Sequence, residues 1–369
     1  DRVGNEAGGY TTHGGVRSGG GRRQHVLSVR VQERRRDERV AGITTWELGG
    51  SADGCGCATT EAGVLDAVAW ADASAHPLTV LGGGSNSIVP DEGVRGLVLH
   101  MGTMGREVRT EGDAVWLRVA AGEPWPALVD WTVAQGWAGL ECLAGIPGQV
   151  GATPIQNVGA YGQDVAETIR RVGCLDRTTK QRVELDAADC AFEYRDSWFK
   201  QNPSRCVVLD VDFELRRGGR PSRRYAELVK STADDASLQE VRDAVVGLRR
   251  RKSMVLDPED PNRRSAGSFF TNPIVEPQRA KSVVEKARAL GCGDVPQWAH
   301  GSRVKLAAGW LIEKAGFPRG TRSGAIGSSS KHGLALVHHG GGTPAERCLL
   351  YTSHAAAAPR TPQSSSRHS

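Results

Sequence analysis

Two glycine-rich loops constrain this chain more than any other feature of its sequence. One loop reads Leu81-Gly82-Gly83-Gly84-Ser85-Asn86-Ser87, and the other spans residues 145–162 as Gly-Ile-Pro-Gly-Gln-Val-Gly-Ala-Thr-Pro-Ile-Gln-Asn-Val-Gly-Ala-Tyr-Gly. Only glycine lets backbone amides crowd a ligand without Cβ clashes. The first loop directly follows a strand-like run, so the pair predicts a site for a bulky phosphorylated ligand such as a cofactor.

The composition is typical of a globular protein with small-molecule partners. The 369 residues are enough for two or three domains, with 39% hydrophobic and 24% charged residues. No apolar run approaches about 20 residues, so we expect no membrane-spanning helix. The net charge of +5 comes from the arginines of residues 1–40 and 344–369, while residues 41–343 are close to neutral. This pattern disfavours nucleic acid as a partner.

The eight cysteines are scattered, and Cys55-x-Cys57 is their only close pair. A recurring pair of Cys-x-x-Cys type, which many zinc sites use, is missing. We therefore expect no metal site and a reduced cytosolic protein.

Local patterns predict a mixture of helices and strands. Helices are expected from a cap at Thr60, over Trp125–Gln135, from the capping box Ser237-x-x-Glu240 to Lys252, and over 277–290 and 307–315. Strands are expected at 78–81, 96–99 and 334–337, with hairpins around Gly112 and between 172–175 and 182–185. Residues 207–215 alternate between apolar and polar, which predicts a strand with one buried face.

Neither glycine-rich loop matches a nucleotide-binding fingerprint. In the first loop, Ser87 occupies the place of the third Rossmann glycine, and no helix follows directly. A backbone nest in which Ser85 and Asn86 bind a pyrophosphate remains open beside a ligand-free turn. In the second loop, the amides of Gln156 and Asn157 suit a flat heterocycle, and a structural Ω-loop is the alternative.

Two polar side chains are candidates for catalysis. Arg195, in Tyr194-Arg195-Asp196-Ser197, can bind a carboxylate with two hydrogen bonds, although a surface Arg–Asp pair would look the same. Ser268 lies between a glycine and aromatic residues, where a hydroxyl shielded from water could donate a proton or merely be buried. Lys252 follows three arginines, which fits either a phosphate site or a solvated helix end.

Taken in order, these motifs resemble those of the UDP-N-acetylenolpyruvoylglucosamine reductases, flavoenzymes of peptidoglycan precursor synthesis. The resemblance covers roughly residues 41–343. It indicates the longer subtype of the family, in which Tyr225 sits where a substrate-closing tyrosine is found. It is carried by Thr44-Thr45, the Gly82 loop, Pro154-Ile155-Gln156-Asn157-Val158-Gly159-Ala160-Tyr161-Gly162, Tyr194-Arg195-Asp196-Ser197, Gly267-Ser268-Phe269-Phe270 and Trp310-Leu311-Ile312-Glu313.

The resemblance implies an α+β fold. A two-part FAD-binding fold of the vanillyl-alcohol-oxidase (PCMH) type would be joined to a third, α+β substrate domain. The expected boundaries are 39–107 and 108–218 for the FAD-binding subdomains and 219–343 for the substrate domain with its return strand. Residues 1–38 and 344–369 are expected to be disordered or non-native.

The implied activity is an NADPH-dependent, FAD-mediated reduction of UDP-N-acetylglucosamine enolpyruvate to UDP-N-acetylmuramate. Arg195 would stabilise the enolate that forms as hydride arrives, and Ser268 would protonate the α-carbon. Tyr194, Tyr225, Lys252 and Asn272 would bind the substrate. Noncovalent FAD would contact Gly82, Gly83, Gly84, Ser85, Asn86, Ser87, Pro147, Gly148, Gly151, Ala152, Thr153, Gln156, Asn157 and Gly159.

One departure from the family concerns the C-terminus. The family places a catalytic glutamate in a Leu-x-Pro-Glu-like segment there, whereas the last acidic residue of this chain is Glu346, in another context. We therefore expect the family's own C-terminus to be lacking, which leaves an inactive FAD-binding remnant or another oxidoreductase of the same fold as alternatives. The resemblance otherwise predicts a monomer in the bacterial cytoplasm.

Overall fold

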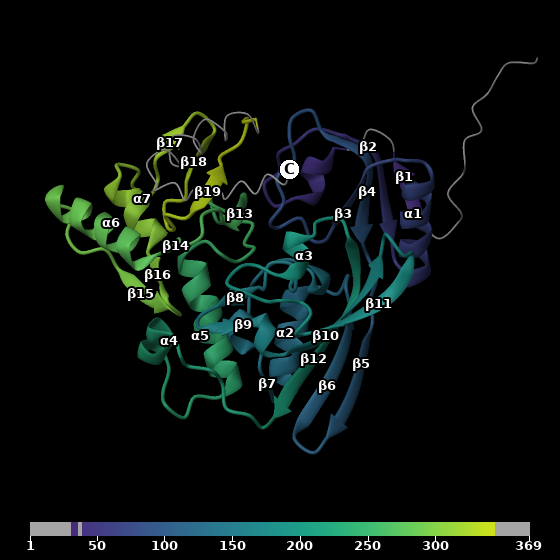
Figure 1. Ribbon diagram of the computed structural model, residues 1–369, viewed down its shortest axis with the longest axis horizontal. Coiled ribbons are helices and arrows are strands. Elements are labelled where there is room, and N and C mark those ends of the chain that lie inside the picture. The colour runs from purple at the N-terminus through teal and green to yellow at the C-terminus, as the bar shows by residue number, and fades with distance from the viewer. Residues whose placement is uncertain (1–30, 36–38, 344–369) are drawn as a thin grey trace, which may run out of the picture.

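The computed structural model of the protein describes residues 31–35 and 39–343. Within these residues the chain builds two large sheets followed by a third part of smaller sheets and helices (Figure 1). None of the helices in this part of the chain has both the length and the apolar character needed to cross a bilayer.

The first sheet has four strands in the order β1-β2-β4-β3. Strands β2, β4 and β3 are parallel, and β1 pairs antiparallel with β2. Helix α1 packs against it, capped by Thr60, whose hydroxyl accepts from the Gly63 amide at 3.1 Å. The elements are β1 (Val31–Arg35), the 3-10 turn η1 (Val40–Ile43), β2 (Ala52–Ala58), α1 (Glu61–Ala73), β3 (Leu78–Leu81) and β4 (Val94–Met101).

The second sheet is antiparallel, in the order β11-β10-β12-β6-β5, with short β7 pairing to β12. Its core is continuous with that of α1 and the first sheet. The elements are β5 (Arg106–Glu111), β6 (Ala114–Ala120), α2 (Trp125–Ala134), β7 (Trp137–Ala138), η2 (Glu141–Leu143), η3 (Val150–Ala152), β8 (Gly159–Ala160), β9 (Gln163–Asp164), η4 (Val165–Glu167), β10 (Ile169–Asp176), β11 (Gln181–Asp186), α3 (Trp198–Gln201) and β12 (Cys206–Arg217).

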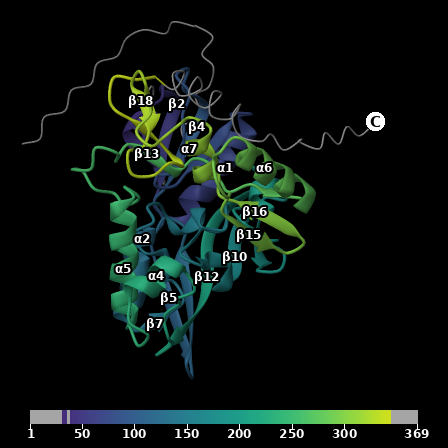
Figure 2. The same ribbon diagram turned by 90° about the vertical axis from the view of Figure 1, so that its left-hand side faces the viewer.

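The third part begins with two helices that lie along one side of the second sheet (Figure 2). The capping box predicted at Ser237 and Glu240 starts the longer of them. Two small sheets follow, β13-β19-β18-β17 and β14-β16-β15. The elements are α4 (Ala226–Ser231), α5 (Leu238–Arg251), β13 (Ser265–Ser268), β14 (Ile274–Val275), α6 (Pro277–Ala289), β15 (Gln297–His300), β16 (Arg303–Leu306), α7 (Ala308–Lys314), β17 (Arg322–Ser323), β18 (Ile326–Ser328) and β19 (Ala335–His338).

The segment before the first helix ties this third part to the rest of the protein. Trp46 and Leu48 pack into one apolar cluster with Ala266, Ile326 and Leu336. The Thr45 hydroxyl donates to the Ser265 carbonyl at 2.6 Å. The first residues of β13 are therefore fixed beside the Gly82 loop, because the Thr45 amide also donates to the Gly84 carbonyl at 3.2 Å.

Two expectations from the sequence need correction. Strand β12 buries both faces over its first half, including Val208 and Asp210, because it is the central strand of its sheet and Asp210 is paired with Arg182 at 2.6 Å.

Residues 31–35 are part of the predicted disordered extension, yet they form β1, because the edge of β2 offers free backbone groups for pairing. The rest of that extension, and all of 344–369 including Glu346, lie outside the described residues.

Candidate active site

The two glycine-rich loops lie directly against each other. A Cβ on Gly83 would be only 3.1 Å from the Gly148 Cα atom, and the Ser85 hydroxyl donates to the Pro147 carbonyl at 3.1 Å. The Gly84 backbone has φ +63° and faces Ile43, whose carbonyl oxygen would be 2.0 Å from an added Cβ. Gly83, Gly84 and Gly148 therefore let the two glycine-rich loops and the segment at Ile43 pack closely together.

Replacing Gly84 with alanine tests this close approach. The left-handed backbone costs alanine about 1–2 kcal/mol, and displacing the Ile43 segment adds about 1–3 kcal/mol. Gly112 is the matched control, since it has φ +58° and open space around its Cβ position. We expect urea denaturation to show a loss of stability in Gly84→Ala that exceeds the loss in Gly112→Ala. Equal losses would show that the contact with Ile43 is unimportant.

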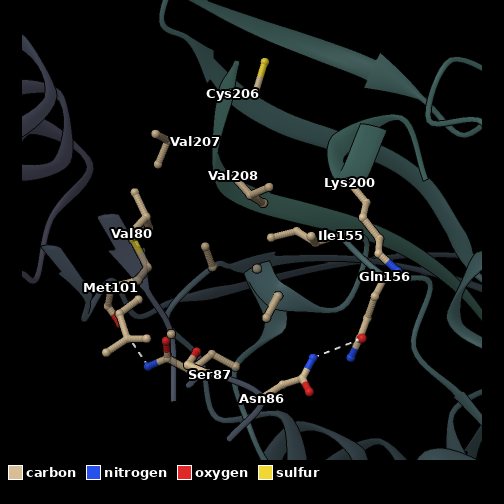
Figure 3. A pocket seen from close by; sticks show the side chains of 16 residues that line it. Val80, Asn86, Ser87, Met101, Ile155, Gln156, Lys200, Cys206, Val207 and Val208 are labelled. Carbon is tan, nitrogen blue, oxygen red and sulfur yellow. Dashed lines mark hydrogen bonds between the residues drawn. The ribbon is translucent and has the colours of Figure 1, made fainter. Parts of the chain in front are cut away.

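The first cavity, which we call the Gln149 cavity, opens between the glycine loops and β12 (Figure 3). Its volume is about 340 Å³. Its walls are largely apolar. Gly151 and Ala152 also line it, and because their side chains are small, the backbone of the second loop lies close to the cavity. The apolar wall consists of Val80, Leu81, Met101, Ile155, Val207 and Val208.

Polar groups line the remaining side of the Gln149 cavity. The Asn86 amide donates to Gln156 Oε1 at 3.1 Å, and Lys200 Nζ donates to the Arg195 carbonyl at 2.7 Å. Gln149 Nε2 donates to the Met101 carbonyl at 2.9 Å, while its buried Oε1 has no partner among the described residues. Gln149 and Lys200 are not among the residues predicted from the sequence. Only the position of Gln149 inside the second glycine loop could have pointed to it.

A second cavity, the Arg195 cavity, adjoins the first and has a volume of about 240 Å³. Asn86 and Gln156 line both cavities, so their paired amides lie where the two meet. The Arg195 cavity brings together both predicted catalytic residues and two predicted substrate residues: Arg195, Ser268, Tyr194 and Asn272. The two residues predicted for catalysis therefore share one cavity, and this cavity reaches both glycine-rich loops at Ser85 and Pro147.

Arg195 is fixed by the backbone on both sides of it. It has φ +57° in a tight turn in which the Glu193 amide donates to the Asp196 carbonyl at 3.0 Å. Asn157 Nδ2 donates to the Glu193 carbonyl at 2.9 Å and links the turn to the second glycine loop. A non-glycine residue in this backbone region is strained, which is common at functional sites.

The guanidinium of Arg195 reaches across that loop. It donates to the Asn157 carbonyl at 3.3 Å, to the Gly159 carbonyl, and to Asp164 at 3.2 Å. A Cβ on Gly159 would collide with Asp164 and Arg195. Gly159 thus makes room for the ion pair of Asp164 and Arg195, and Gly159 itself lines the Arg195 cavity.

Ser268 enters the same cavity from β13 and is hydrogen-bonded to His332, with 2.9 Å between Oγ and Nε2. The expectation that this hydroxyl is shielded from water is wrong, because Ser268 is exposed. Its neighbours Phe269 and Phe270 pack against the cluster around Trp46, and Phe270 also lines the Arg195 cavity.

Arg249, which was likewise not predicted from the sequence, adds a cation to the Arg195 cavity. One of its terminal nitrogens donates to the Met254 carbonyl at 2.6 Å, whereas its buried Nε has no partner within the part of the chain that the structure describes. Burial lowers the pKa of Arg249 to about 10, so the group remains charged at neutral pH. A cation held in this way suits an anionic ligand.

Tyr225 and Lys252 form a separate cluster around Tyr161. The Tyr225 and Tyr161 rings meet edge to face at 5.3 Å, and Lys252 Nζ lies 5.7 Å from the Tyr161 ring centre. Burial acts to lower the pKa of Lys252, but its 2.7 Å hydrogen bond to Glu227 and the nearby Tyr161 outweigh that effect and raise it. Neither Tyr225 nor Lys252 lines the Arg195 cavity.

The residues predicted to bind the cofactor divide into two groups. Those that line one or both cavities are Gly82, Ser85, Asn86, Ser87, Pro147, Gly151, Ala152, Gln156 and Gly159. Those that line neither are Gly83, Gly84, Gly148, Thr153 and Asn157. The second group supports the loops: the Thr153 hydroxyl donates to the Val150 carbonyl at 2.8 Å, and Asn157 bonds to backbone groups through both amide atoms.

Comparison with protein families agrees with this geometry. The FAD binding domain family matches residues 53–182. The family of the C-terminal domain of UDP-N-acetylenolpyruvoylglucosamine reductase matches residues 258–355. The chain thus combines an FAD-binding unit with a further domain known from one class of reductase.

Individual relatives support the same assignment. The UDP-N-acetylenolpyruvoylglucosamine reductase of Thermobifida fusca is 47% identical over 326 residues, covering 85% of this chain and 91% of the relative. That of Streptomyces coelicolor is 46% identical, covering 85% and 83%. The crystal structure of the Thermus caldophilus reductase, at 24% identity, covers 89% of this chain and 96% of its own with a TM-score of 0.62, which shows the shared fold.

The chain belongs to the UDP-N-acetylenolpyruvoylglucosamine reductase family. Its fold is the predicted α+β arrangement of a two-part FAD-binding unit of the PCMH type and the C-terminal domain of that family. The residues present fit FAD: the Gln149 cavity offers apolar walls for a ring system, close backbone, and an unsatisfied buried acceptor at Gln149 Oε1.

Proposed function

We propose that this protein uses NADPH and bound FAD to reduce UDP-N-acetylglucosamine enolpyruvate to UDP-N-acetylmuramate. One observation carries the proposal: Arg195 and Ser268 face one cavity that adjoins the Gln149 cavity at Asn86 and Gln156. A cation and a hydroxyl at such a junction suit the addition of hydride to a double bond conjugated to a carboxylate. Membership of the reductase family supports the same substrate.

FAD supplies the hydride when it is bound in the Gln149 cavity. Arg195 binds the carboxylate of the enolpyruvyl group and stabilises the negative charge that develops on it. Ser268 then donates its hydroxyl proton to the α-carbon. The bonds from Arg195 to Asn157 and Asp164 keep the guanidinium in place while the charge develops, so little reorganisation is needed.

The nucleotide part of the substrate would occupy the remaining polar surface. The Asn272 Oδ1 atom accepts from the Ala308 amide at 3.0 Å, so we assign its Nδ2 donor to the substrate. Arg249 would bind a phosphate in the Arg195 cavity. Tyr225 and Lys252 would close over the bound diphosphate from their cluster at Tyr161. Tyr161 follows two residues after Gly159, which lines the Arg195 cavity, so the cluster is close to that cavity along the chain.

Two further parts of the proposal concern the state of the protein in the cell. The substrate and NADPH are both expected in the bacterial cytoplasm, and we place the protein there. A monomer is expected, since one chain supplies both cavities and every candidate residue in them.

Visible absorption spectroscopy tests the proposed reaction. The purified protein should bind FAD and show a flavin spectrum that NADPH bleaches under anaerobic conditions. Adding UDP-N-acetylglucosamine enolpyruvate should restore the absorbance, while UDP-N-acetylglucosamine, which lacks the double bond, should not. A protein that binds FAD but gives no recovery with the enolpyruvyl substrate would be a flavin-binding remnant, and one that binds no FAD would contradict the proposal altogether.

A further inference from the structure

The imidazole that is hydrogen-bonded to Ser268 has no role in the proposed reaction. His332 lies in the turn before β19, and its Nε2 atom is 2.9 Å from Ser268 Oγ. This turn is well anchored: the Ser329 hydroxyl accepts from the amides of Lys331 and His332, both at 3.2 Å. Lys331 Nζ in turn bonds to buried Asp260 at 3.1 Å. The imidazole is therefore held at a fixed position relative to the hydroxyl.

Positive charge surrounds His332 on several sides. Arg249 and Lys252 approach from the end of α5, and Arg319 approaches from the loop after α7. Arg319 is paired with Glu313 at 3.0 Å, so that acid is already neutralised. Burial, with these three cations, lowers the pKa of His332 to about 4. The ring is consequently neutral at physiological pH and has one N–H and one free lone pair.

The direction of the Ser268–His332 hydrogen bond decides whether the serine can react. If the hydroxyl donated to Nε2, its proton would point away from the substrate. If Nε2 carries the hydrogen and donates to Oγ, the serine proton is free to point into the Arg195 cavity. The same donor would also stabilise the oxygen as its proton leaves.

We propose that His332 is a positioning residue for the proton donor, present as the Nε2–H tautomer and donating to Ser268 Oγ. This role rests on the proposed function, because it matters only if Ser268 donates its proton to the substrate. The tautomer, however, is a property of the protein alone and can be measured without substrate.

Nitrogen NMR tests the tautomer directly. In FAD-loaded protein carrying ¹⁵N-histidine, the His332 signals, assigned by their loss in His332→Gln, should be those of a neutral ring protonated at Nε2 between pH 6 and 8. An Nδ1–H ring or an imidazolium in this range would overturn the proposal. This outcome is independent of whether the protein reduces the enolpyruvyl substrate.

Kinetics of two variants test the role. Glutamine can place an amide N–H near the position of Nε2, so His332→Gln should keep most of the activity. His332→Leu removes the donor and should lower the rate of substrate reduction by about 10²-fold, with FAD binding and reduction by NADPH unchanged. His76→Leu, at an exposed histidine, controls for the general effect of removing an imidazole. Equal losses in His332→Gln and His332→Leu, or none in either, would contradict the role.

Discussion

Replacing Arg195 with methionine is expected to lower kcat for reduction of the enolpyruvyl substrate by about 10²–10³-fold, the usual cost of losing a donor to a developing oxyanion. The side chain removed is the cation in the Arg195 cavity that is aimed by three hydrogen bonds. The KM for the substrate should rise as well, because the carboxylate is present before the reaction begins. Stopped-flow absorbance measures this step apart from reduction by NADPH, which should be unaffected.

Arg195 also holds the second glycine loop, so a structural loss must be separated from a catalytic one. Arg170 is a matched control, because it donates to the carbonyls of Glu167 and Ile169 and to the Glu214 carboxylate, away from both cavities. Arg170→Met should have a comparable effect on the melting temperature and nearly wild-type activity. If Arg170→Met lost as much activity as Arg195→Met, the effect would be one of stability.

Replacing Ser268 with alanine is expected to slow the same step by about 10²–10⁴-fold, the range for losing a positioned general acid. The cavity would keep its cation, so substrate should still bind with little change in affinity. Ser268→Cys restores an acidic hydrogen at nearly the same place and should recover part of the rate. Ser302→Ala, at an exposed turn between β15 and β16, should behave as wild type.

The solvent isotope effect tests whether Ser268 is the proton donor. In the wild-type protein, deuterium oxide should slow substrate reduction if proton donation contributes to the barrier. In Ser268→Ala the remaining slow reaction must take its proton from water. A full rate in Ser268→Ala would show that another group protonates the α-carbon.

The pH dependence of stability offers a check on the environment of His332. Its folded-state pKa of about 4 lies below the ordinary value of 6.5, so the unfolded chain takes up a proton first as the pH falls. His332 therefore costs stability progressively between about pH 6.5 and pH 4. The variant His332→Gln should lose less stability over this window when both proteins are unfolded by urea. Parallel curves would mean that the histidine is not held neutral.

Short-range features of this protein could be read from the sequence because the interactions that create them are short-range. The Thr60 cap and the Ser237–Glu240 capping box each join residues three positions apart, and both occur as predicted. The hairpin around Gly112 follows from one turn between two strands. The family motifs likewise predicted the fold, because their order along the chain is itself a sequence property.

The sequence could not distinguish residues that line a cavity from those that support it. Asn157 and Gln156 are neighbours in one motif, yet Asn157 turns its amide to backbone groups while Gln156 lines both cavities. Similarly, Gly159 is required by the approach of the Asp164 carboxylate and of Arg195, and Arg195 comes from a different turn. Such roles depend on which distant side chain arrives nearby, and no local pattern encodes that.

The sequence by itself therefore determined the glycine loops, most helices, the two hairpins β5–β6 and β10–β11, and the choice of Arg195 and Ser268 as candidates for charge stabilisation and proton donation. The tertiary structure alone decided that Arg195 and Ser268 share a cavity and that His332 is hydrogen-bonded to the serine. It also decided that Gln149 and Arg249 each keep a buried atom with no partner in residues 31–35 and 39–343. The physical reason is that local hydrogen bonds are set by spacing along the chain, whereas a cavity forms only when separate segments pack together.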